Sequence, residues 1–395
     1  MSPGCHRRGA GILGGLLGVV LLVATPVTPT ASAKSAASKI QSHRYDDGLG
    51  LTVELRLDHA PYAARKSAEG RNTVMVFFPW FWLWEQPPAR GRRGLDTLVF
   101  FHGHSSRADW AMLCPEHCSR RGKDRYLREQ VVASRQNIMV VVPQGPWVRD
   151  SSDGGRLDNS EGFTDMMTEV RKVVTSRAMN AIRKSVASRV ARSARKAGHG
   201  GLASKLTGSW SRPMDRSMRI GRIALAAFSG GYKVLANCIA RGGLEVHEVY
   251  LFDALYGELR TFRDWLLATQ DITGRDPQWW LRHRLVTYEI DRKNRKVAQG
   301  TASLRKMLDR ADFPYAREEA RSLLTLEEFE QASAVFSSRK ELRAEHRSAV
   351  HKGWQLRDCL LTSAFTRLRR FKEVDDFWAG EDAKPRAIDK NKKSP

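Results

Sequence analysis

The chain has 395 residues, 42% of them hydrophobic, and a formal net charge of +23. This hydrophobic content suffices for a sizeable core and excludes a chain too polar to fold. The excess of positive charge favours anionic partners such as cell-wall polymers, acidic glycans, anionic lipids or nucleic acid, and it carries no information about the fold.

The first residues have the features of an export signal. Arg7 and Arg8 precede an apolar run at residues 12–24, and small residues stand at 31–33, where a signal peptidase cleaves. The run is short for a bilayer-spanning helix, although an uncleaved anchor is the alternative. We therefore predict a signal peptide at residues 1–33, an exported protein that is periplasmic or secreted, and no transmembrane segment in the mature chain.

Strand patterns begin near residue 50. Residues 51–57 alternate between apolar and polar side chains, while residues 97–101 and 138–142 are continuous apolar runs, typical of strands buried on both faces. Helical patterns separate the later strands and indicate β-α-β units. The other expected strands are residues 73–78, 222–228, 246–252 and 284–290. The sequence therefore predicts an α/β fold with a mostly parallel sheet flanked by helices.

One large domain is expected at residues 49–380. Before it, residues 34–48 are small and polar and predict a flexible N-terminus. After it, residues 381–395 form a charged tail that we expect to be disordered. Near the end of the domain, residues 301–335 carry a helical pattern of leucines.

A basic helical insertion is predicted at about residues 171–219. Residues 164–197 have apolar side chains at helical spacing, and glycines at 198, 200 and 201 are expected to end the helix. From Arg171 to Arg219 there are thirteen Lys or Arg residues and one acid, Asp215. The stretch can be a lid, a docking surface or a solvated helix face.

The most informative segment surrounds Ser229. An apolar strand runs directly into the serine, and a helical pattern follows it. Ala227 and Gly231 stand two residues before and after it, and a sharp strand-to-helix turn needs small neighbours there. Such a turn exposes the hydroxyl to a base and points the Gly230 amide at a developing oxyanion. The alternative is a glycine-rich turn that binds an anion or only packs.

Two further loops follow predicted strands. His102, Gly103 and His104 come directly after residues 97–101, and residues 143–146 follow the next strand with the sequence Pro-Gln-Gly-Pro. A His-Gly pair permits a tight turn that aims an amide at a substrate oxygen. The carboxyl ends of parallel strands meet at one edge, where ligands bind in α/β sheets. We therefore expect Gly103 and His104 to contribute to an oxyanion hole with Gly230.

Together these segments resemble the α/β-hydrolase superfamily over roughly residues 50–365. Two departures concern the elbow: Ala227 replaces its usual first glycine, and Phe228 replaces the histidine that many esterases carry beside the serine. They leave the substrate class open. The resemblance implies a nucleophile, an acid and a histidine in that chain order.

The acid and the histidine each have two candidates. Asp253 ends one strand and is favoured, while Asp291 ends the next strand but precedes a charged turn. His351, before a closing amphipathic helix, is favoured over His346, which lies in a charged run. For either acid, a helix cap or a surface ion pair is the alternative role.

The cysteines permit disulfides in an exported protein. Cys114 and Cys118 can form a local disulfide, remain free thiols, or join His117 in a metal site that lacks a second ligand pair. The resemblance also suggests a bridge between Cys359, near the closing helix, and Cys238, on the helix behind the serine.

We therefore expect an exported serine hydrolase that cleaves an ester or amide bond through an acyl-serine intermediate. No metal and no organic cofactor is implied. Aromatic residues at 78–84 and 279–280 either stack sugars of an envelope or polysaccharide-linked substrate or pack at a strand edge. The alternative function is a non-catalytic protein of this fold that binds an anionic envelope polymer. Nucleic-acid binding is disfavoured by the export signal.

Overall fold

The strands described by the computed structural model form one sheet. The model describes residues 38–46, 48–58, 73–80, 94–104, 106–113, 126–145, 154–210, 214, 218–268, 283–289, 295–319, 324–338, 354–363 and 365. The strands are β1 Lys39–Asp46, β2 Gly50–Arg56, β3 Thr73–Pro79, β4 Leu95–Phe101, β5 Met139–Pro143, β6 Ile220–Phe228, β7 Glu248–Phe252, β8 Arg284–Glu289, β9 Ala316–Glu319 and β10 Ala334–Ser338. Their order across the sheet is β1-β2-β3-β5-β4-β6-β7-β8-β10-β9.

Most of the sheet is parallel. β1, β2 and β3 pair antiparallel with one another, and β3 pairs antiparallel with β5. From β5 to β9, every described pairing is parallel. The predicted fold class, a mostly parallel sheet flanked by helices, is confirmed. All carboxyl ends of the parallel strands therefore meet at one edge of the sheet.

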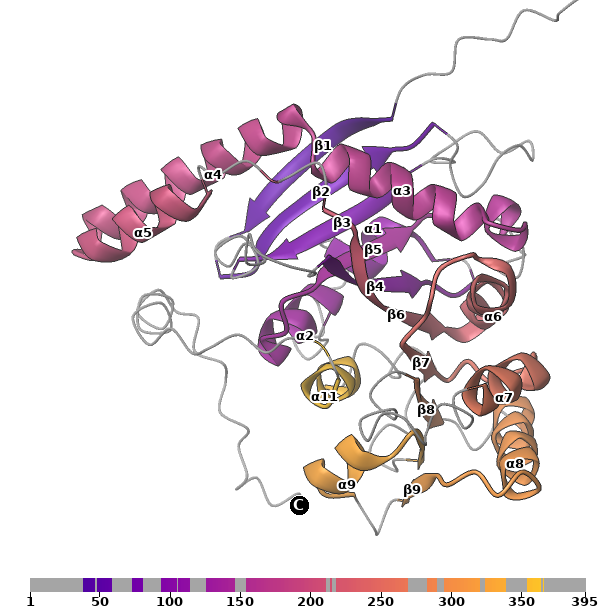
Figure 1. Cartoon of the computed structure of the whole chain (residues 1–395). Coiled ribbons are helices and arrows are strands. Elements are labelled where there is room, and N and C mark those ends of the chain that lie inside the picture. The colour runs from indigo at the N-terminus through magenta and orange to yellow at the C-terminus, as the bar shows by residue number, and fades with distance from the viewer. Residues whose placement is uncertain are drawn as a thin grey trace, which may run out of the picture. The chain divides into compact units, whose positions relative to one another are not determined.

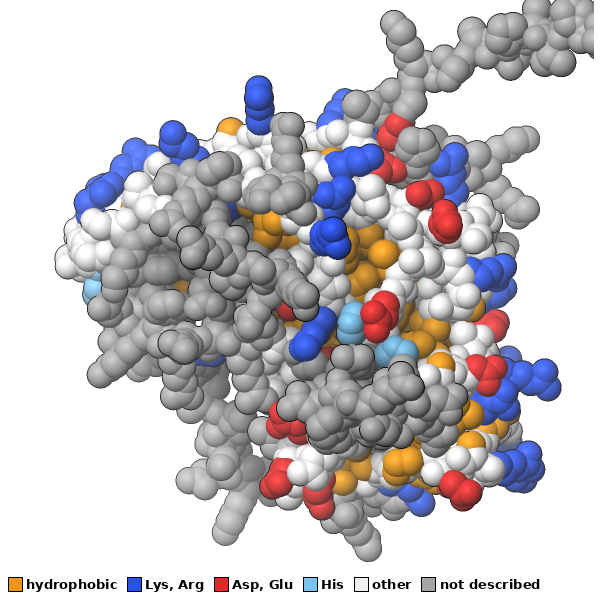
Figure 2. All heavy atoms as spheres, in the orientation of Figure 1, with side chains coloured by type: hydrophobic (Ala, Val, Ile, Leu, Met, Phe, Trp, Pro, Cys, Tyr) orange, Lys and Arg blue, Asp and Glu red, His pale blue; other side chains and the backbone are white. Residues whose placement is uncertain are grey.

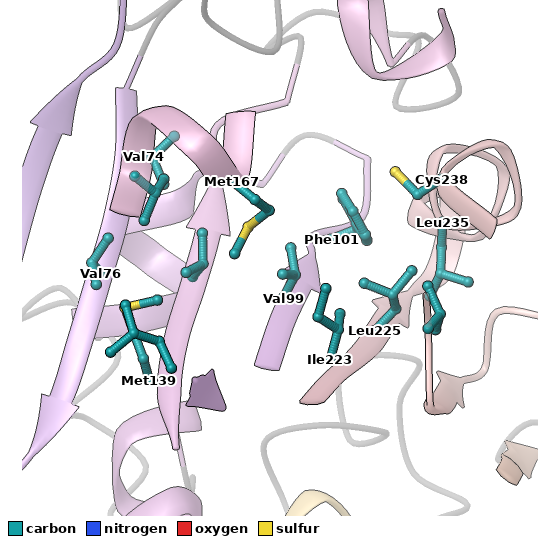
Figure 3. Close-up of a cluster of buried hydrophobic side chains, with 14 of the residues drawn as sticks. Val74, Val76, Val99, Phe101, Met139, Met167, Ile223, Leu225, Leu235 and Cys238 are labelled. Carbon is teal, nitrogen blue, oxygen red and sulfur yellow. The ribbon is translucent and has the colours of Figure 1, made fainter. Parts of the chain in front are cut away.

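Two layers of helices cover the sheet because its strands alternate their side chains between two apolar faces. On one face, Val99, Phe101, Ile223 and Leu225 pack beneath Leu235 (Figure 3). Helices on this side are α3 Gly162–Val174, α6 Tyr232–Arg241, α7 Leu259–Leu267 and α8 Arg295–Asp309 (Figure 1). The other face packs against α1 Ala108–Leu113, α2 Leu127–Ser134, α9 Leu326–Gln331 and α11 Gln355–Leu361.

The basic insertion forms two separate helices, whereas the sequence predicted that one helix, begun before the insertion, would end within it. The expected helix at residues 164–197 is broken after α3, and α4 Arg177–Lys196 starts anew. Its N-cap is Ser176, whose hydroxyl accepts a hydrogen bond from the Met179 amide at 3.2 Å. The glycines expected to end the helix instead open α5, Gly200–Trp210.

Three strands, β1, β9 and β10, were not expected from the sequence. β1 forms within the stretch predicted to be flexible, and its side chains are mostly exposed because it lies at the edge of the sheet. The helical prediction for residues 301–335 holds only up to Asp309, where α8 ends, and Asp312 then has a positive φ of 49°. β9 lies within the rest of this region and β10 at its end. The remaining domain limits stay predictions, and residues 1–33 and 381–395 lie outside the described residues.

The prediction of a disulfide between Cys238 and Cys359 is wrong. Cys238 lies on α6 in the apolar cluster of one face, whereas Cys359 lies on α11 in the cluster of the opposite face. Both are free thiols, and burial raises the pKa of each. The sheet separates them, so α6 and α11 are held by packing. Cys114, His117 and Cys118 lie outside the described residues.

The described helices include none with the length and apolar character needed to cross a membrane.

Removal of Leu225 should measure how much the helical layer over β6 contributes to stability. Its side chain is fully buried, so Leu225→Ala leaves a cavity beneath α6. We expect the free energy of unfolding, measured by urea denaturation, to fall by about 2–5 kcal/mol. Lys306→Ala, at an exposed position of α8, is the control and should change it by less than about 0.5 kcal/mol. Equal effects would contradict the packing described here.

Candidate active site

Ser229 occupies a strained turn between β6 and α6. Residues Ser229–Gly231 form one short 3₁₀ turn, and the Tyr232 amide donates to the Ser229 carbonyl. The backbone of Ser229 has a φ of 52°, in the left-handed region that L-residues other than Asn and Asp rarely adopt. This conformation costs about 1–2 kcal/mol for a residue with a Cβ atom. Ser229 is partly exposed, while Gly230 and Gly231 are buried.

Small residues make the turn sterically feasible. A Cβ atom on Gly231 would lie 2.6 Å from the carbonyl oxygen of Phe101. A Cβ atom on Gly103 would lie 2.8 Å from the Cβ of Ser229. The loop after β4 therefore rests directly against the serine. Ala227, where the superfamily usually has glycine, is fully buried in β6 opposite Leu251 of β7.

His102 ties the loops after β4 and β5 together. The Gly145 amide donates to its Nε2 at 2.8 Å, and its Nδ1 lies 3.0 Å from the Gly103 carbonyl. Because a backbone N–H can only donate, Nε2 is the acceptor, and the ring proton resides on Nδ1 and is donated to Gly103. The ring is buried, and this burial lowers its pKa, partly offset by the Gly103 hydrogen bond and by the charge of Asp109.

Gln144 extends this connection to α1. Its Oε1 accepts from the Ala108 amide at 2.9 Å, and its Nε2 donates to the Gly145 carbonyl at 2.8 Å. Neither His102 nor Gln144 was assigned a role from the sequence, although both lie in the two loops that it singled out. These side chains fix the position of Gly103 beside Ser229.

Asp253 leaves the sheet beside Ser229. Phe228 of β6 pairs with Phe252 of β7, so the two next residues, Ser229 and Asp253, follow neighbouring strands at the same level. Asp253 is fully buried, has a φ of 46°, and its amide donates to the Tyr288 carbonyl at 2.8 Å. Its position at the carboxyl edge agrees with the placement expected from the sequence.

The other candidate residues divide into two groups. His104 is exposed in the turn after Gly103, where the Ser106 amide donates to the Gly103 carbonyl at 3.3 Å. Asp291, His346 and His351 lie outside the described residues. In the chain, Asp291 follows β8 and both histidines follow β10, two parallel strands that end at the same edge as β6.

Two tyrosines beside the turn were missed in the sequence. Tyr232 begins α6, and its ring centroid lies 5.7 Å from that of Tyr256 in the loop after β7. A Cβ atom on Gly257 would lie 3.4 Å from the Tyr232 hydroxyl. Burial and the charge of Glu258 raise the pKa of Tyr232, so the phenol is neutral at physiological pH. Both side chains are half-buried at the edge that carries Ser229.

In the aromatic segment at residues 78–84, the two described aromatic side chains pack on the core. Phe78 is fully buried, and Trp80 is half-buried against the same apolar cluster. Residues 81–84 and residues 279–280 lie outside the described residues. The described part therefore favours packing over sugar stacking. Among the described residues, no group of three His, Cys, Asp or Glu side chains could hold a metal ion.

Comparisons with known proteins identify similar structures. No protein-family model matches the chain, and no curated protein matches it. An S-formylglutathione hydrolase from Agrobacterium tumefaciens is similar with a TM-score of 0.32 and 11% identity, over 82% of this chain and 96% of that one. The fluorophosphonate-binding serine hydrolase F of Staphylococcus aureus has a TM-score of 0.36 and 11% identity, over 79% and 98%.

A feruloyl esterase module from Clostridium thermocellum, solved as an S954A mutant with sinapinate, has a TM-score of 0.35 and 12% identity, over 83% of this chain and 92% of that one. The assignment of an α/β-hydrolase-like fold rests on this chain's own strand order and on its strand–serine–helix turn.

Replacement of Ser229 should reveal the strain in the turn. Glycine adopts a positive φ without steric conflict, whereas alanine retains the conflict. We therefore expect the free energy of unfolding of Ser229→Gly to exceed that of Ser229→Ala by about 1 kcal/mol in urea denaturation. The control pair is Ser188→Gly and Ser188→Ala on the exposed side of α4, where glycine should be the less stable residue. The same sign at both positions would exclude strain at Ser229.

Protonation of His102 should destabilise the protein. The pKa of His102 lies below the usual value of 6.5, so the unfolded chain takes up this proton before the folded protein does. The contribution of neutral His102 to the free energy of unfolding is fully present above about pH 6.5, and it falls as the pH decreases toward the lowered pKa. The difference in free energy of unfolding between wild type and His102→Gln should therefore shrink between about pH 7.5 and pH 5.5. A constant difference would contradict a neutral, buried acceptor.

Proposed function

We propose that this protein is a serine hydrolase that cleaves an ester or amide bond through an acyl-serine intermediate, with Ser229 as the nucleophile. The observation that carries the proposal is the left-handed turn at Ser229. This turn follows a buried parallel strand, and Gly103, in the loop after β4, packs against it. A packing or anion-binding turn does not require a strained serine, whereas an exposed nucleophile does.

The chemistry assigns one role to each candidate residue. His351, with His346 as the alternate, removes the hydroxyl proton of Ser229 and returns it to the leaving group. Asp253, with Asp291 as the alternate, holds the imidazole in the required tautomer and stabilises its charged form. Asp253 is supported by its burial and by its position next to Ser229 on the neighbouring strand.

The oxyanion forms when Ser229 Oγ attacks the carbonyl carbon of the substrate. The Gly230 amide, at the start of the turn into α6, is the first proposed donor. The second is an amide of the Gly103–His104 loop, which His102 and Gln144 hold in place. One such donor contributes roughly 3 kcal/mol to lowering the barrier. No metal and no organic cofactor takes part in this scheme.

Location and substrate follow from other features. The export signal expected at residues 1–33 supports action outside the cytoplasm, in the periplasm or as a secreted protein. The half-buried Tyr232 and Tyr256 supply an aromatic wall next to the nucleophile. A substrate with an apolar or aromatic group beside its ester or amide bond would use this wall, including one attached to an envelope polymer or polysaccharide.

A fluorophosphonate probe tests the nucleophile, because it reacts with activated serines. We expect the wild-type protein to be labelled at Ser229 and Ser229→Ala not to be labelled. Absence of labelling in the wild type, combined with binding of an anionic polymer, would instead support the non-catalytic alternative.

Hydrolysis of p-nitrophenyl acetate is a second assay, which distinguishes between the two candidate acids and between the two candidate histidines. Asp253→Asn and His351→Gln should each lower kcat by about a thousandfold or more, while Asp291→Asn and His346→Gln act as matched controls with losses below about tenfold. The reverse pattern would reassign the acid and the base.

A further inference from the structure

The exposed side of α4 is a continuous cationic surface. It carries seven exposed basic side chains together with the end of α3: Lys172, Arg177, Lys184, Arg189, Arg192, Arg195 and Lys196. The sequence contains no acid between Glu169 and Asp215, so neither α4 nor α5 has a carboxylate that compensates this charge. In Figure 2, Lys and Arg side chains gather along the outer side of α4, at the upper left of the molecule.

The apolar side of α4 is already occupied. Met179, Val186, Val190 and Ala194 are buried in the main core cluster, which also includes Ala203 of α5. Arg189 fixes α4 to β1, since its guanidinium lies 5.0 Å from the ring centroid of Tyr45 and donates to the Tyr45 carbonyl at 3.3 Å. The surface that remains is polar, and a helix without a free apolar side does not insert into a bilayer.

A buried arginine adds to the positive potential of this surface. Arg183 faces the interior with 1% of its surface exposed, and desolvation lowers its pKa to about 10. It therefore stays charged at neutral pH. Its Nη1 donates to Asn180 Oδ1 at 3.2 Å, and the same oxygen accepts from the Met214 amide at 2.9 Å. These contacts hold the chain that leaves α5 against α4 and make the surface a preformed one.

The chain that forms α4 and α5 rejoins the sheet at the start of β6. Arg171, at the end of α3, donates to the Met218 carbonyl, and β6 begins two residues later at Ile220. Ser229 follows the other end of β6, whose 9 residues span about 30 Å. Figure 1 shows α4 and α5 extending outward past β1. This attachment favours a docking surface over a lid that covers Ser229.

We propose that the exposed cations of α4 bind a single-chain phosphodiester polymer of the cell envelope. Guanidinium groups match phosphate oxygens in paired hydrogen bonds, and four of the seven exposed cations are arginines. The 20 residues of α4 span about 30 Å, so a flexible polyanion can follow the row of charges along the helix. The export signal expected at residues 1–33 would bring the protein to the compartment that contains such polymers. This binding does not depend on Ser229.

Fluorescence anisotropy with a labelled synthetic poly(glycerol phosphate) tests the proposal on the full chain. The variant Lys184→Gln/Arg192→Gln/Lys196→Gln removes three exposed charges of α4. It should weaken binding by about tenfold or more and make binding less dependent on salt concentration, because fewer counterions are released. The matched control, Lys296→Gln/Lys306→Gln/Arg310→Gln, removes the same residue types from two exposed positions of α8 and from the exposed residue that follows it, and should change affinity less than about twofold.

The charge-preserving variant Lys184→Arg/Arg192→Lys/Lys196→Arg should retain binding, which separates loss of charge from loss of folding. Fluorophosphonate labelling of Ser229 should be unchanged in all three variants, so failure of this proposal is distinguishable from failure of the proposed hydrolase. Equal losses in the α4 and α8 variants would overturn the proposal. Tighter binding of duplex DNA or of phosphatidylglycerol vesicles through the same α4 residues would also overturn it.

Discussion

The left-handed turn at Ser229 is the constraint on which the carboxyl edge of the sheet depends. On one side it is held by β6, whose residues from Ile223 to Ala227 are buried, and on the other by α6, which packs through Leu235 and Cys238. Gly231 passes so close to the Phe101 carbonyl that no side chain fits there. The two packed elements therefore sustain a backbone conformation that serine rarely adopts.

Loop packing converts this strained residue into a candidate site. Gly103 lies so close to Ser229 that a Cβ atom on it would meet the Cβ of the serine, and His102 and Gln144 bind the loops after β4 and β5 to each other. His102 does this as a neutral ring, so the arrangement depends on a buried group that resists protonation. The chain of the basic helices enters β6 at the end opposite Ser229. One strand therefore connects the proposed polyanion-binding helices to the proposed nucleophile.

The sequence predicted the parts of the fold that local pattern determines. The continuous apolar runs of β4, β5 and β6 and the small residues around Ser229 identified the parallel sheet and the turn. β1 was missed because an exposed edge strand has a polar sequence. β9 and β10 were missed because four and five residues are too few to separate strand from helix periodicity. The Cys238–Cys359 bridge failed because spacing does not reveal which side of the sheet each helix covers. The role of His102 depends on an amide from another loop, which leaves no local pattern.

The distance from Ser229 Oγ to the nearest imidazole nitrogen in a high-resolution crystal structure tests the central claim most directly. We expect a positive φ at Ser229 and a ring nitrogen of His351 or His346 within about 3.2 Å of Oγ. A serine in ordinary helical or extended geometry, with its hydroxyl turned into the core and neither histidine within reach, would contradict this claim.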